Sequence, residues 1–90
     1  MEQYEIALIS CIETVLMRRG NTNYILVLSK LDSYYNCKIR DCYDHPEYLK
    51  AILKEVYKEN YYSIINEIRL ELSDLAVEEI NDFINIMLKL

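Results

Sequence analysis

The chain has 90 residues, which is the length of one domain and leaves no room for a second hydrophobic core. Apolar residues make up 52% and charged residues 28% of it, so we expect residues 1–90 to form a single packed domain rather than a disordered chain. With one Gly, one Pro and a net charge of −5, the composition excludes collagen-like, low-complexity and strongly basic chains. The negative net charge also argues against a dedicated nucleic-acid-binding protein, because such proteins are normally basic.

The first half of the chain begins with two predicted helices. Over residues 2–19, apolar side chains recur at i, i+3 and i+4 on one helix face: Tyr4, Leu8, Cys11, Ile12, Val15 and Leu16. Gly20 is expected to end this helix. The run Asn21-Thr22-Asn23 is predicted to cap a second helix over residues 23–35, although residues 24–28 are also β-prone.

Residues 36–43 lack a clear period and are predicted to form a loop or one short extended segment, anchored by Ile39. The next four residues are the strongest local signal in the chain. Asp44 is a capping acid, Pro46 falls in the first turn, and Glu47 stands three residues after the cap. They predict a third helix that runs to about Asn60 and, because its apolar face is wide, lies at the centre of the fold.

Two further helices are predicted over residues 61–72 and 75–89, with a break at Ser73-Asp74, where the apolar stripe slips in phase. The sequence therefore predicts an all-α fold, a compact bundle of about five helices in one domain.

The N-terminus is acidic where a secretory signal would be basic, and every apolar run is far shorter than the roughly 20 residues that span a bilayer. We expect a cytoplasmic protein without a membrane span. Three cysteines do not suit a secreted disulfide framework, and in a reducing cytosol they would be thiols. Pairing of Cys37 with Cys42 stays open.

Cys37, Cys42 and His45 group two thiols and the only imidazole within nine residues. Such donors suit zinc, and a helix start after Cys42 would favour its thiolate. No fourth ligand is evident, however, and we favour small side chains packed for structural reasons, with no metal or cofactor predicted. A single Gly excludes glycine-rich phosphate loops, and no catalytic residues are predicted, so we do not expect an enzyme.

Positive charge is concentrated in residues 18–40, where five bases stand against one acid: Arg18, Arg19, Lys30, Lys38 and Arg40. Residues 66–90 carry six acids and two bases. The simplest interpretation is a solvated surface. The alternatives are a basic patch that meets an acidic partner, or one that meets this chain's own acidic C-terminal region.

Nine of the ten aromatic residues are Tyr. The two members of Tyr34-Tyr35, or of Tyr61-Tyr62, cannot both point inward on a helix, so at least one of each pair is expected at the surface. Residues 86–90, Ile-Met-Leu-Lys-Leu, are also apolar except for Lys89. The predicted contact residues are Tyr34, Tyr35, Tyr61, Tyr62, Met87 and Leu90, and the expected partner is another protein or a second copy in a homodimer.

The run Asp41-Cys42-Tyr43-Asp44-His45-Pro46-Glu47-Tyr48-Leu49, followed by Leu53-Lys54-Glu55-Val56-Tyr57, resembles a small archaeal family of the nitrosopumilus output domain type. Ser73-Asp74 departs from it, because a Gly-containing turn is expected there. The resemblance implies an all-helical fold, an archaeal origin and a signalling-output or interaction role, and it assigns no catalytic residue.

The sequence thus favours a non-enzymatic helical interaction module. One alternative is a metal- or redox-responsive switch at Cys37, Cys42 and His45. The other is a helical DNA-binding regulator that uses basic residues of the 18–40 segment: Arg18, Arg19, Lys38 and Arg40.

Overall fold

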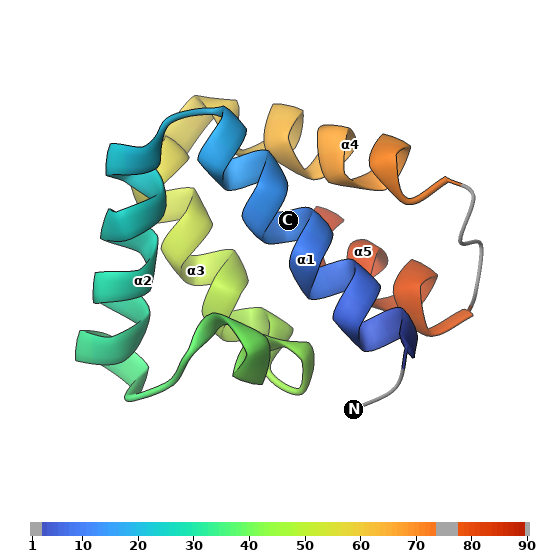
Figure 1. Cartoon of the computed structure of the whole chain (residues 1–90), viewed down its shortest axis with the longest axis horizontal. Coiled ribbons are helices and arrows are strands. Elements are labelled where there is room, and N and C mark those ends of the chain that lie inside the picture. The colour runs from blue at the N-terminus through green and yellow to red at the C-terminus, as the bar shows by residue number, and fades with distance from the viewer. Residues whose placement is uncertain (1–2, 74–77, 90) are drawn as a thin grey trace.

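The computed structural model describes residues 3–73 and 78–89, and within them every regular element is a helix (Figure 1). The expected all-α fold is therefore confirmed. The α-helices are α1 (Gln3–Arg18), α2 (Asn21–Tyr35), α3 (Pro46–Tyr57), α4 (Tyr61–Glu71) and α5 (Glu78–Leu88). Two 3-10 helices, η1 (Ile39–Tyr43) and η2 (Lys58–Asn60), lie before and after α3.

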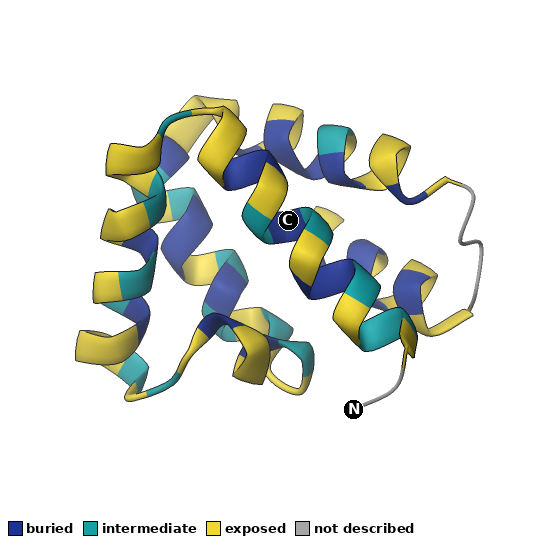
Figure 2. Ribbon diagram, in the orientation of Figure 1, coloured by how far each residue is buried: buried dark blue, intermediate teal, exposed yellow. Residues whose placement is uncertain are grey.

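The helices enclose one core in a body that measures 31 × 26 × 25 Å. Both α1 and α3 contact α2, α4 and α5, so the predicted central position of α3 is shared with α1 (Figure 1). The buried positions of each helix face the interior and the exposed positions face outward (Figure 2). The result is the arrangement that the apolar stripes require.

The core is built from aliphatic side chains with few aromatic ones. Among the described residues, the largest fully buried side chains are Leu8, Ile12, Leu16, Leu31, Leu49, Ile52, Leu53, Tyr61, Ile64, Ile65, Ile68 and Met87. Each fully buried Leu, Ile or Met stabilises the fold by about 1.5–3 kcal/mol relative to an exposed side chain. No charged side chain of the described residues is buried.

Gly20 forms the junction between α1 and α2. Its φ of 137° lies in a region that side chains with a Cβ rarely adopt, so glycine is required by conformation. Gly20 is also the N-cap of α2, which begins at Asn21. The predicted cap within residues 21–23 is therefore wrong by one to three residues, because the glycine itself makes the turn.

The segment between α2 and α3 is more regular than predicted. Instead of a loop or an extended strand, residues 39–43 form a 3-10 helix, closed at its start by a hydrogen bond from the Lys38 amide to Asp41 Oδ2 (2.9 Å). The predicted anchoring by Ile39 is confirmed, since this side chain is buried. The N-cap of α3 is His45 rather than Asp44, with Pro46 in the first turn as expected.

At their other ends, α3 and α4 stop slightly before the predicted positions. The last predicted turn of the third helix, up to Asn60, is the 3-10 helix η2. After α4, Leu72 and Ser73 form a turn in which the Ser73 amide donates to the Leu70 carbonyl (3.3 Å). Asp74 and the predicted start of the fifth helix at Leu75 lie outside the described residues. None of the described helices is long and apolar enough to cross a membrane.

Candidate functional site

Cys37, Cys42 and His45 lie along the connection from α2 to α3. The thiols of Cys37 and Cys42 are hydrogen-bond partners, but His45 is not grouped with them. Cys42 is fully buried in η1, and its thiol approaches the Lys38 carbonyl at 3.9 Å. His45 is exposed, and its Nδ1 lies 3.1 Å from a carboxylate oxygen of Glu47. Within residues 3–73 and 78–89, no three His, Cys, Asp or Glu side chains come together as a metal site would require. Cys37 and Cys42 are free thiols in the structure.

The environment of the thiols keeps them protonated. Burial raises the pKa of Cys42 to about 12, and burial together with the carboxylate of Glu71 raises the pKa of Cys11 to about 11. Burial also raises the pKa of Cys37. The expectation that a helix N-terminus would favour the Cys42 thiolate is wrong, because Cys42 lies inside the 3-10 helix and is desolvated there.

These pKa shifts predict slow alkylation of Cys42. At pH 8, folding should lower the rate at which iodoacetamide modifies Cys42 by at least about 100-fold relative to the chain in urea, since only the thiolate reacts. Cys37 is partly exposed and should react first. Mass spectrometry of the modified peptides would measure the order. Modification of Cys42 as fast as Cys37 would contradict the burial described here.

His45 belongs to a stack of three rings that joins α2 to α3. The ring of Tyr48 lies between the other two, with its centroid 4.2 Å from that of Tyr35 and 4.6 Å from that of His45. The interplanar angles are 7° and 9°. The stack gives His45 a structural contact at the start of α3.

The predicted contact tyrosines divide between surface and core. Tyr34 and Tyr62 are exposed, which confirms that at least one member of each pair lies at the surface. Tyr35 is half-buried in the ring stack. Tyr61 is the inward member of its pair and is therefore wrong as a contact residue, because its ring is buried in the core, where it packs edge to face with that of Tyr62 (centroids 5.0 Å apart).

Met87 is also wrong as a surface contact, because its side chain is buried. Its carbonyl accepts a hydrogen bond from the hydroxyl of Tyr61 (2.7 Å). Carbonyls in the last turn of a helix lack an intrahelical partner, so Tyr61 caps the end of α5 from within the core. Leu90 lies outside the described residues. Of the apolar C-terminal residues, Ile86 and Leu88 remain exposed.

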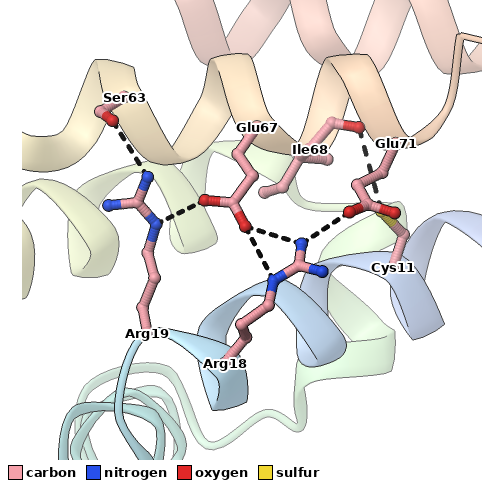
Figure 3. A network of polar contacts seen from close by, with 7 residues as sticks. All are labelled: Cys11, Arg18, Arg19, Ser63, Glu67, Ile68 and Glu71. Carbon is pink, nitrogen blue, oxygen red and sulfur yellow. Dashed lines mark hydrogen bonds and ion pairs between the residues drawn. The ribbon is translucent and has the colours of Figure 1, made fainter.

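The two arginines at the end of α1 bind the chain's own carboxylates on α4 (Figure 3). Arg18 Nη2 lies 2.7 Å from Glu67 and 2.6 Å from Glu71. Arg19 Nε donates to Glu67 (2.8 Å) and its Nη2 donates to Ser63 Oγ (3.0 Å). For these two arginines, the structure matches the alternative of contact with the chain's own acidic C-terminal region rather than the simpler interpretation of a solvated surface.

This network joins α1 to α4 and neutralises charge on both. Burial alone would raise the pKa of Glu67, but the guanidinium groups of Arg19 and Arg18 outweigh it and hold this pKa below its usual value. Lys30 forms a further ion pair with Glu55 of α3 (2.9 Å). Three of the five basic residues of the 18–40 segment are thus paired within the molecule, which leaves less positive charge to attract nucleic-acid phosphates.

The remaining two bases, Lys38 and Arg40, line a cleft between α1, α2 and η1 with a volume of about 490 Å³. The cleft is also lined by two acidic residues, Glu13 from α1 and Asp32 from α2. We call this the α1–α2 cleft. Its first and last lining residues, Glu13 and Arg40, are 27 positions apart in the sequence, so no local sequence motif could indicate it.

The outward side of α2 combines two large aliphatic side chains with small polar ones, and the exposed Asp32 lies at its edge. Ile25 is 56% exposed and Leu26 41% exposed, although both stand in the middle of a helix whose other side buries Val27 and Leu31. At 100° per residue, they share the outward side with small polar residues. We define the outer face of α2 as Thr22, Ile25, Leu26, Ser29 and Ser33, all of them exposed.

The two charged residues of α2 lie beside this face rather than on it. Lys30 turns to Glu55 and to the hydroxyl of Tyr34 (3.2 Å), and Asp32 lines the α1–α2 cleft. A sequence signal for the outer face exists, because Ile25 and Leu26 fall off the apolar stripe that the buried residues define.

No protein-family model, no curated protein and no solved structure matches this chain.

Proposed function

We propose that this chain, a helical bundle, is a non-enzymatic interaction module that associates with a second copy of itself through the outer face of α2. The observation that carries the proposal is the exposure of Ile25 and Leu26 on a face without charge. Adjacent exposed aliphatic side chains on a regular helix lose contact with water when a partner covers them, and this stabilises association.

The absence of charge on this face favours a second copy as the partner. In a two-fold symmetric contact, each patch meets itself, so any charge near the centre would face a like charge. The chain carries −5 overall, yet the residues from Thr22 to Ser33 on the outer face add nothing to that repulsion. Ser29 and Ser33 are small enough for two such helices to approach closely.

One helix face is a small contact, below the roughly 1,200 Å² of standard protein interfaces. We therefore expect a reversible dimer with a Kd of about 10–100 µM. Such an affinity suits a signalling-output role of the kind that the resemblance implies, in which association changes with local concentration. Cytoplasmic location and archaeal origin are part of the same proposal.

A charge placed on the outer face tests the proposal. Leu26→Asp should weaken self-association at least about ten-fold, because two desolvated carboxylates would face each other across the contact. Leu70→Asp is the matched control, since Leu70 is 62% exposed on α4 and away from α2. Sedimentation velocity of the variants, with circular dichroism to verify folding, gives the comparison. Equal weakening by both variants would contradict the assignment of α2.

A further inference from the structure

We infer that the α1–α2 cleft binds a small zwitterion of the amino-acid or short-peptide class, with its carboxylate at Lys38 and Arg40 and its ammonium group at Asp32. This inference concerns a different face of α2 from the one that carries the proposed self-association, and it does not depend on that proposal. It follows from the charges and the size of the cleft, and from the charged side chains there that have no ion-pair partner among the described residues.

The cleft is lined by charged side chains of both signs, which come from different elements. The two cations come from residues 38 and 40, which follow α2, and the two carboxylates come from the helices α1 and α2. Among the described residues, the side chains of Lys38, Arg40 and Asp32 take part in no ion pair. Each is therefore available to a ligand of opposite charge.

The fourth charged group has a different role. The carboxylate of Glu13 accepts a hydrogen bond from the hydroxyl of Tyr24 (2.5 Å), and this bond, together with burial, raises the pKa of Tyr24 to about 12. Glu13 and Tyr24 thus hold each other in place at the wall between α1 and α2. Asp32 remains as the carboxylate that faces the cleft without a partner among the described residues.

The size and walls of the cleft match a small molecule. Its volume of about 490 Å³ lies within the range of about 300–1,000 Å³ that is usual for ligand sites. Leu28 and Ile39 add apolar surface to its lining. A ligand with an apolar body and one charge of each sign can pair with the cations, the carboxylate and the apolar lining, whereas a simple anion would leave Asp32 unpaired.

The dipeptide leucyl-leucine is a suitable probe, because it has free termini of both signs and an apolar body. Titration to about 10 mM, followed by ¹H–¹⁵N correlation spectra of the full chain, should shift the amide signals of Lys38, Arg40 and Asp32 with a Kd of about 0.1–1 mM. N-acetyl-leucyl-leucine and leucyl-leucine amide each lose one charge and should bind about ten-fold more weakly. Equal affinity of all three compounds, or no shifts at these residues, would overturn the inference.

Variants of the cations give a second test. Arg40→Gln should weaken dipeptide binding about three- to ten-fold, and Arg69→Gln on α4, which changes the net charge equally, should not weaken it. Cys37 also lines the cleft, so bound dipeptide should slow its alkylation and leave that of Cys11 unchanged, because Cys11 packs near Ile68 of α4 instead. Equal effects of the two arginine variants, or equal protection of both thiols, would contradict the assigned site.

Discussion

Replacing Tyr61 by Phe should lower the free energy of unfolding by about 1–2 kcal/mol, because it leaves a buried carbonyl at the end of α5 without a partner. The hydroxyl of Tyr61 donates to the Met87 carbonyl at 2.7 Å, and both residues are buried. Replacement by Ala also removes the ring from the core and should cost about 3–5 kcal/mol. Urea denaturation followed by circular dichroism would measure both changes.

Tyr57 is the matched control. It is a second buried tyrosine, but its hydroxyl has no hydrogen-bond partner among the described residues. Tyr57→Phe removes an unsatisfied polar group, so the free energy of unfolding should stay unchanged or rise by up to about 1 kcal/mol. If both Phe variants lose the same stability, the bond from Tyr61 to Met87 does not cap α5 as described.

Stability should fall steeply above pH 9. Burial raises the pKa of Cys42 from 9.0 to about 12 and that of Tyr43 from 10.0 to about 12. The pKa of Cys11 is raised to about 11, and the pKa of Tyr61 is raised as well. In the unfolded chain these groups ionise near their ordinary values, so the unfolded state loses protons first and is stabilised as the pH rises.

The sign and the size of this change in the free energy of unfolding can be worked out for the buried thiol of Cys42. Below pH 9, Cys42 is protonated in both states and its contribution is fully present, and it is lost as the pH rises from 9 towards 12. Each pH unit in that window costs about 1.4 kcal/mol for one such group. Denaturation curves from pH 7 to 11 should show a flat region and then a decline. Cys42→Ala should make the decline shallower, and an unchanged slope would contradict the burial of this thiol.

Most helix positions could be predicted because each depends on local periodicity. The stripe of Leu8, Ile12 and Val15 predicts a buried face whatever it packs against, and the structure buries all three. The 3-10 helix η1 was missed, since five residues are too few for a helical period to be visible. The cap of α3 was misplaced by one residue for a similar reason, because Asp44 and His45 are both followed by a suitable first turn.

The candidate site depended on which helices meet, and that information is not local. Tyr61 and Met87 were named separately as candidate contact residues, but packing of α4 against α5 brings them together in the core. The pairing of Arg18 with Glu67 could be anticipated from the uneven charge, although the specific carboxylates could not. The α1–α2 cleft required the relative placement of three elements.

The central claim is that this chain associates with a second copy of itself, and sedimentation velocity of the unmodified protein tests it most directly. Between about 10 µM and 1 mM, the proposed dimer should raise the weight-average mass from near 10.8 kDa towards twice that value. A mass that stays at 10.8 kDa throughout this range would contradict the claim.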